Sequence, residues 1–238
     1  MKGAALVTVI AALGMRHGVD PDHLSVIDGL SRFHPSRWNG VYFALGHGII
    51  VTLLAVGFGK LLAGFVAPYT VWILLALGFA NLWRLWRPRQ HKHPKPPRLF
   101  QASPLLLGVL FGMGFETASQ LSAILLAGQL NPWILGAVFS FGMMLVDGTD
   151  GFLAARTQQL ALTGHNRSVR SSRALGVLVV VVSFGVAGGE LAGVDINRLA
   201  LPLGVVLFAS VVFLRLWSGG TRWSRPSPNN PRVQSGRT

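Results

Sequence analysis

Seven apolar segments, each long enough to cross a lipid bilayer, dominate the sequence. A membrane-spanning helix needs about 20 mainly apolar residues, and only 12% of this chain is charged, about half the share in soluble domains. The segments lie at residues 4–30, 38–64, 66–87, 103–128, 132–155, 174–194 and 199–217. The sequence therefore predicts an all-α, polytopic membrane helix bundle over residues 1–217. The basic tail at 218–238 lacks hydrophobic periodicity, which is typical of disorder.

Basic residues indicate how the predicted bundle is oriented. Seventeen of the 21 Lys and Arg residues follow the first, third, fifth or seventh segment. The positive-inside rule then places the N-terminus outside and the C-terminus in the cytoplasm. A signal peptide cleaved after Gly14 is the alternative, and it would leave six spans.

The net charge of +13 would also suit a nucleic-acid-binding protein. These charges, however, form short clusters between apolar segments, where a membrane topology places them. We therefore expect no nucleic-acid partner. The basic loop at 84–98 is instead interpreted as a contact with anionic membrane lipid.

Acidic residues and histidines occur where a lipid-facing helix would exclude them. Six of the eight acids and three histidines fall inside predicted spans: Asp20, Asp22, Asp28, Glu116, Asp147, Asp150, His17, His23 and His47. One Asp, Lys or Arg at a helix centre costs about 2.5–3.5 kcal/mol on insertion scales. These groups must therefore face a polar interior, which is a functional-site hypothesis by default. A purely structural network of His–Asp hydrogen bonds is the alternative.

The stretch RHGVDPDH at 16–23 is the densest part of this pattern. On a regular helix His17, Asp20 and His23 would share one slowly drifting face, with Asp22 pointing elsewhere. Pro21 has no backbone N–H and clashes with the carbonyl four residues earlier, so it predicts a distortion that frees the carbonyl of His17. Broken helices at mid-membrane line the ion sites of many transporters.

The chemistry of these side chains limits which ions they could bind. Imidazole and carboxylate together suit divalent first-row metals such as Ni²⁺, Co²⁺ and Zn²⁺, whereas carboxylates alone would suit Mg²⁺ or Ca²⁺. The chain has no cysteine, which excludes thiolate sites. His–Asp relays also serve proton transport, so a proton-coupled carrier of another solute stays open. The sequence contains no H-E-x-x-H motif of a metalloprotease and no Walker A motif.

Four stretches, in order, resemble the nickel/cobalt transporter family, NiCoT. They are RHGVDPDHL (16–24), FALGHGIIV (43–51), GFETASQ (114–120) and GMMLVDGTDG (142–151). The first fits the family's His-x4-Asp-His pattern. The resemblance implies secondary uptake of Ni²⁺, Co²⁺ or both across a bacterial cytoplasmic membrane, with the metal as cargo, no prosthetic group and no enzymatic activity. Export is the alternative, because direction depends on gradients that the sequence does not encode.

Site roles follow from the same resemblance. His17, Asp22, His23 and His47 are expected to bind the metal first, with Asp20 beside them. Glu116, Asp147 and Asp150 are expected to balance charge or guide exit. Because only neutral histidine ligates metal, uptake is expected to fall as pH drops through the ordinary histidine range, near 6.5.

The chain departs from the family pattern in three respects. Glu116 replaces an Asp, Gln120 stands where a Glu is usual, and Gly148 replaces a Thr. The family usually has eight spans with both termini cytoplasmic, whereas seven are predicted here. Loss of the first family helix would give this topology. Metal preference is the property that these departures affect most.

Overall fold

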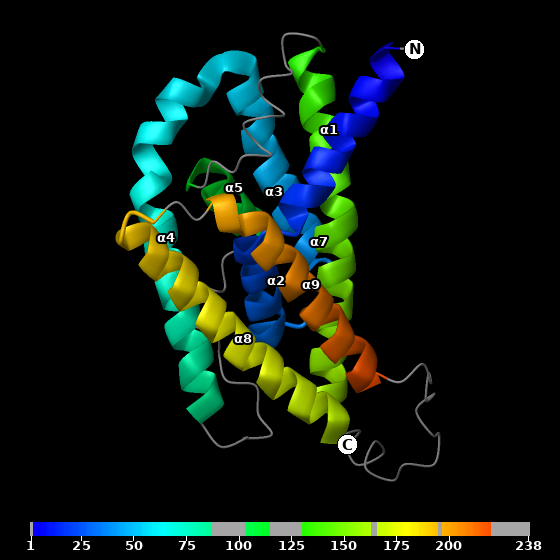
Figure 1. Ribbon diagram of the computed structural model, residues 1–238, viewed down its shortest axis with the longest axis vertical. Helices are drawn as coiled ribbons and strands as arrows, with labels where there is room; N and C mark the ends of the chain where they lie inside the picture. The colour runs from blue at the N-terminus through cyan, green and yellow to red at the C-terminus, as the bar shows by residue number, and fades with distance from the viewer. Residues whose placement is uncertain (1, 87–102, 115–129, 163–165, 195–196, 220–238) are drawn as a thin grey trace, which may run out of the picture.

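The computed structural model describes residues 2–86, 103–114, 130–162, 166–194 and 197–219, and Figure 1 shows that they form a bundle of α-helices. No strand occurs in these described ranges, so the all-α prediction is confirmed. Three described helical stretches are long and apolar enough to cross a bilayer, namely Asn39–Gly57, Pro132–Leu162 and Asn166–Leu191. Shorter apolar stretches lie at Gly3–Gly18, Val71–Trp86, Pro104–Met113 and Pro202–Ser218. The count of seven spans therefore stays a prediction.

The first predicted span, 4–30, is two helices. Helix α1 (Lys2–Gly18) ends before Asp20, whose extended backbone (φ −60°, ψ 144°) precedes helix α2 (Pro21–Phe33). Pro21 is the first residue of α2, where its missing N–H leaves no helical bond unmade. The predicted break at Pro21 is confirmed, and it directs the end of α1 and the start of α2 into the bundle.

The second and third spans differ from their predicted bounds. Helix α3 (Asn39–Leu53) continues as a π-helical turn, η1 (Leu54–Phe58), and α4 (Gly59–Trp86) follows directly. The predicted boundary near residue 65 was wrong because the chain turns at Gly57, whose φ of 111° favours glycine. Apolar composition alone continues through this turn and cannot locate it.

The remaining described helices are α5 (Pro104–Gly114), α7 (Pro132–Leu162), α8 (Asn166–Leu191) and α9 (Asn197–Gly219). Helix α7 extends 7 residues beyond its predicted end at 155, and α8 begins 8 residues before its predicted start at 174. The end of the fourth predicted span and most of the predicted tail lie outside the described residues. Figure 1 places the start of α1 and the end of α9 at opposite ends of the molecule.

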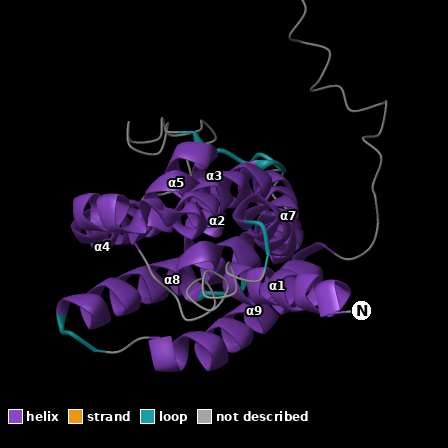
Figure 2. Ribbon diagram, turned by 90° about the horizontal axis from the view of Figure 1, so that it is seen from above, coloured by secondary structure: helices purple, strands orange, loops and turns teal. Residues whose placement is uncertain are grey.

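Helix α2 is the central element of the bundle. All 13 of its residues are buried, and it contacts α3, α4, α7, α8 and α9. Figure 2 shows it surrounded by other helices when the bundle is viewed from above. Its apolar residues Leu24, Ile27 and Leu30 pack into a core with Leu74 and Leu77 of α4. The polar residues of α2 are thereby held away from the outer surface.

The outer surface is apolar. Large side chains with more than half of their surface exposed occur on several helices: Trp72, Phe79 and Trp83 of α4, Phe141 of α7, Val181 of α8, and Val206 and Phe213 of α9. Meanwhile His17, His47 and Asp147 are fully buried. Polar residues inside and aromatic residues outside are the arrangement expected of a helix bundle in lipid.

Close helix contacts depend on two glycines at the centre. A Cβ atom on Gly14 of α1 would collide with the backbone carbonyl of Phe139 in α7. A Cβ atom on Gly40 of α3 would collide with the backbone carbonyl of Asp147, also in α7. Small residues that let backbones approach are typical of membrane helix interfaces. These contacts bring α1 and α3 against the segment of α7 that carries Asp147.

Candidate metal site

The break between α1 and α2 forms the first wall of the site. The amide of Val19 donates to the carbonyl of Arg16 at 3.2 Å, and the amide of Asp20 donates to the carbonyl of His17 at 2.9 Å. The expectation that Pro21 leaves the His17 carbonyl free was therefore wrong, because the tightened last turn of α1 supplies another donor. The carbonyl end of α1 still points into the bundle, where a helix C-terminus favours a cation.

Three histidines meet at this break. His17 from α1, His23 from α2 and His47 from α3 each offer a ring nitrogen, and these atoms all lie within 4.8 Å of one another. Their ring centroids are 4.5 to 4.7 Å apart. All three side chains are fully buried. The structure thus brings together residues that are up to 30 positions apart in the sequence.

The spacing of two of these nitrogens suits a shared ion. His17 Nε2 lies 2.8 Å from His47 Nε2. Two neighbouring ligands at right angles on one ion, with metal–nitrogen bonds of about 2.1 Å, would be roughly 3 Å apart. In the structure the two rings share a hydrogen bond.

Two carboxylates form hydrogen bonds with two of the histidine rings. His17 Nδ1 lies 3.0 Å from Asp20 Oδ2, and His23 Nδ1 lies 3.1 Å from Asp147 Oδ2. An ionised carboxylate only accepts, so each Nδ1 carries a proton, and in the neutral form of each ring Nε2 then has the lone pair. Carboxylates in this position orient metal-binding histidines and increase their basicity. Asp20 and Asp147 thus contact the histidine rings, and their predicted roles toward a metal stay predictions.

His23 has a ring nitrogen available for a ligand. Its Nε2 atom is buried and has no hydrogen-bond partner among the described residues. The edge of its ring packs on Phe43, with centroids 4.9 Å apart, and His17 packs on Phe139 at 5.6 Å. These aromatic walls exclude water and hold the rings in place. A buried nitrogen that lacks a partner marks the position that a metal ion would take.

Asp22 lies outside the group of three nitrogens. It occupies the first turn of α2 and is buried, with 7% of its surface exposed. A carboxylate at this position complements the positive end of the helix dipole. Glu116 falls outside the described residues, so its predicted role cannot be placed.

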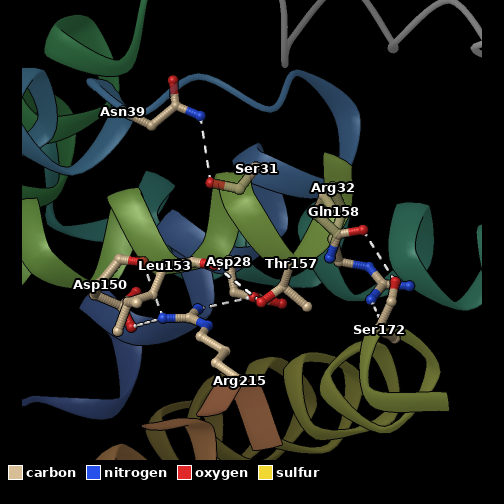
Figure 3. Close-up of polar contacts among 10 residues, drawn as sticks. All are labelled: Asp28, Ser31, Arg32, Asn39, Asp150, Leu153, Thr157, Gln158, Ser172 and Arg215. Carbon is tan, nitrogen blue, oxygen red and sulfur yellow. Dashed lines mark hydrogen bonds and ion pairs between the residues drawn. The ribbon is translucent and has the colours of Figure 1, made fainter. Parts of the chain in front are cut away.

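Asp150 belongs to a different cluster from Asp147. Figure 3 shows its carboxylate on the guanidinium of Arg215, which also reaches Asp28. Arg215 Nη1 donates to the carboxylate and to the backbone carbonyl of Asp150, and Nη2 donates to Asp28 Oδ1 at 2.9 Å. Asp150 thus has other partners than the histidines, and its predicted role near the metal stays a prediction.

Two members of this second cluster were missing from the predicted site. Asp28 is evident in the sequence as an acid inside a span, and Arg215 as a basic residue near the end of the last span. The sequence interpretation assigned Arg215 to the cytoplasmic flank. The sequence held no signal that separates a buried arginine near the end of a span from a flanking one.

Comparison with known proteins identifies relatives of the chain. The family model NicO, described as high-affinity nickel-transport protein, matches residues 101–212. The hydrogenase nickel incorporation protein HupN of Bradyrhizobium diazoefficiens is 27% identical over 81% of this chain and 65% of its own length. The nickel transporter NicT of Mycobacterium tuberculosis is 25% identical over 79% and 66%.

A third relative, the high-affinity nickel-transport protein NixA of Helicobacter pylori, is 23% identical over 83% of this chain and 77% of its own length. The chain spans just under two thirds of HupN and NicT. No solved structure matches the chain significantly. The predicted resemblance is confirmed by these matches: the chain is similar to nickel-transport proteins, and its residues 101–212 match the NicO model.

Proposed function

We propose that this chain is a secondary transporter that takes up Ni²⁺ through the three-histidine cluster. The observation that carries the proposal is the set of three buried ring nitrogens within 4.8 Å, from three separate helices. Nitrogen ligands suit Ni²⁺, and at a given N/O site Ni²⁺ binds more tightly than Co²⁺. The names of the relatives, which mention nickel, support the same cargo. Co²⁺ is the second candidate.

Binding requires a change of tautomer at one ring. The proton on His17 Nδ1 is held by Asp20, so His47 Nε2–H must donate the 2.8 Å hydrogen bond to His17 Nε2. An ion that takes both Nε2 atoms displaces that proton, which moves to His47 Nδ1 or leaves the site. Metal binding thus replaces one hydrogen bond by two coordinate bonds, with His23 Nε2 supplying a third.

The site is closed in this conformation. All three histidines and Asp147 are fully buried, so an ion cannot reach or leave the cluster without helix movement. Alternating exposure around a fixed mid-membrane site is the general scheme of secondary transporters. The chain then uses the metal gradient or another ion gradient and performs no covalent chemistry, which places it among carriers and not among enzymes.

The proposed topology has seven spans, an external N-terminus and a cytoplasmic C-terminus, in the cytoplasmic membrane of a bacterium. The positions of the basic clusters support it, as does the separation of the start of α1 from the end of α9 in Figure 1. Because the chain has no cysteine, single cysteines can report each side. We expect a membrane-impermeant maleimide to label Gly3→Cys in intact cells, but Arg167→Cys only after permeabilisation. The reverse pattern would overturn this topology.

The experiment that tests the function is ⁶³Ni accumulation in cells that express equal amounts of wild type, His17→Ala, His23→Ala or His34→Ala. His34 is exposed after the end of α2 and serves as the control. We expect the first two variants to fall at least about tenfold, the lower limit seen even when a residue behind a metal ligand is lost. Equal accumulation in all four strains would refute the proposal. Accumulation of ⁵⁷Co in the same strains tests Co²⁺ as the second candidate cargo.

A further inference from the structure

A second buried polar cluster involves α2 and α7, the helices that carry His23 and its partner Asp147, together with α9. Asp28 comes from α2, Asp150 from α7, and Arg215 reaches both from α9. Figure 3 shows the guanidinium between the two carboxylates. The three side chains have 0 to 2% of their surface exposed. A charged cluster this deep in an apolar bundle must be held by its own partners.

The charges of this cluster do not balance. Among these three side chains one guanidinium faces two carboxylates, so in their ionised forms they would carry one net negative charge; Arg84 of α4 also attracts the charge of Asp28. Asp28 Oδ2 and Asp150 Oδ2 are both buried and have no hydrogen-bond partner among the described residues. Arg215 therefore satisfies one oxygen of each carboxylate and leaves the other open. Carboxylate oxygens that lack donors in an apolar surrounding attract a cation.

The second cluster lies immediately next to the histidine cluster. Asp147 and Asp150 are separated by three residues of α7, a rise of about 4.5 Å, and His23 and Asp28 by five residues of α2, about 7.5 Å. Asp147 bonds to His23, whereas Asp150 and Asp28 share Arg215. An ion that leaves the histidines along α2 and α7, away from α1, meets these carboxylates first.

The surroundings of Asp28 include a small cavity at the junction of α2, α8 and α9. Ser25 and Asp28 are its polar lining residues, and the rest of the lining is apolar. Ser25 lies one turn from Asp28, and its hydroxyl donates to the carbonyl of Pro21 at 2.7 Å. The cavity has room for about one water molecule, so a larger shift of the Arg215 side chain requires movement of the helices around it.

We propose that Asp28 and Asp150 form a second cation site on the path of the transported divalent ion, and that Arg215 occupies it as a tethered cation that the ion must displace. The inference rests on the proposed function for the identity of the ion. Arg215 then holds α9 against α2 and α7 while the path is closed. Displacement by the ion releases α9, which couples passage of the cargo to opening of that side.

The test counts ⁶³Ni²⁺ ions bound per chain by equilibrium dialysis of purified, detergent-solubilised protein. Wild type is expected to bind one ion, at the histidines. Arg215→Gln removes the tethered cation and is expected to bind two ions, a twofold increase. Arg173→Gln, which removes the same charge from an exposed position on α8, is the matched control and should bind one. Asp28→Asn combined with Arg215→Gln should return the count to one.

A folded Arg215→Gln protein that binds the same number of ions as wild type would overturn the proposal. If that variant does not fold, Arg215→Lys tests the second cation site in its place. Lysine keeps the positive charge, but its single ammonium cannot bridge two carboxylates as a guanidinium does. We expect Arg215→Lys to take a second ion at higher ⁶³Ni²⁺ concentration. Absence of a second ion in that variant overturns the inference.

The same measurement separates this inference from the proposed function. If the histidines do not bind Ni²⁺, wild type binds none and Arg215→Gln still binds one. If the carboxylates form no cation site, wild type and Arg215→Gln both bind one. Addition of His23→Ala to each protein identifies which ion is lost.

Discussion

The two polar clusters on α2 and α7 bury charge in different ways. In the histidine cluster, Asp20 and Asp147 each hold one ring nitrogen and so direct the other toward the centre. In the second cluster, Arg215 fills the space between Asp28 and Asp150. The first arrangement presents His23 Nε2 without a partner and a hydrogen bond between His17 and His47 that an ion can replace, and the second is already closed by a cation. The same helices thus carry one site prepared for a ligand and one that a side chain of the protein occupies.

The difference teaches what to expect from mutations. A residue that orients a ligand can be lost with little cost to folding, because its partner ring is still packed. A residue that neutralises buried charge cannot, because its loss leaves ions without partners in an apolar interior. Variants in the histidine cluster should therefore change mainly metal affinity, and variants in the second cluster should change mainly the free energy of unfolding.

The largest effect is expected for Arg215→Ala. Breaking a buried ion pair by removal of one partner costs about 3–5 kcal/mol, and here two carboxylates lose their guanidinium. We expect the free energy of unfolding in detergent to fall by that amount. Arg173→Ala, which removes an exposed arginine from α8, should stay within about 0.5 kcal/mol of wild type. Similar stability for both variants would show that the second cluster does not carry buried, ionised partners.

The contrast between the clusters also explains which parts of the site could be predicted from the sequence. His17 and His23 are six residues apart, and Pro21 between them indicates the break, so the local pattern already predicts a site. His47 could be added because the rise per helical residue places it at the same depth. The burial of these histidines and their convergence follow from the cost of polar groups in lipid.

The second cluster could not be found in this way. Asp28 and Arg215 are 187 residues apart, and no local pattern connects them. Arg215 near the end of a span has the composition of a flanking charge, and hydropathy does not distinguish a flanking arginine from a buried one. Only the packing of α9 against α2 and α7 makes the pairing visible.

Asp150 illustrates the limit of arguments from depth alone. It lies three residues after Asp147, and at 3.6 residues per turn the two side chains point about 60° apart around the helix. One carboxylate therefore faces His23 and the other faces Arg215. The sequence gives only the position of each carboxylate along the helix, whereas direction around the helix required the positions of the neighbours.

A smaller effect is expected for Asp147→Ala, and it should appear in metal binding. Loss of the carboxylate leaves the His23 ring without its Nδ1 partner, and removal of such partners typically costs 10–100-fold in metal affinity. We expect the dissociation constant for ⁶³Ni²⁺ in equilibrium dialysis to rise by about this factor, with the number of ions bound unchanged. Thr149→Ala, on an exposed face of the same helix, is the control. An unchanged affinity would mean that His23 does not ligate the ion.

The smallest effect is expected where the two carboxylates of the histidine cluster are compared with each other. Asp20→Asn and Asp147→Asn both keep an acceptor oxygen for the Nδ1–H group and remove only the charge. Asp20 also lies 3.5 Å from Arg16, whose side chain is 21% exposed, whereas Asp147 is fully buried. Arg16 and solvent already offset part of the charge of Asp20, and its influence on His17 is correspondingly weaker. ⁶³Ni²⁺ affinity should therefore fall less in Asp20→Asn than in Asp147→Asn, and the opposite order would show that His17, and not His23, is the ring whose basicity controls binding.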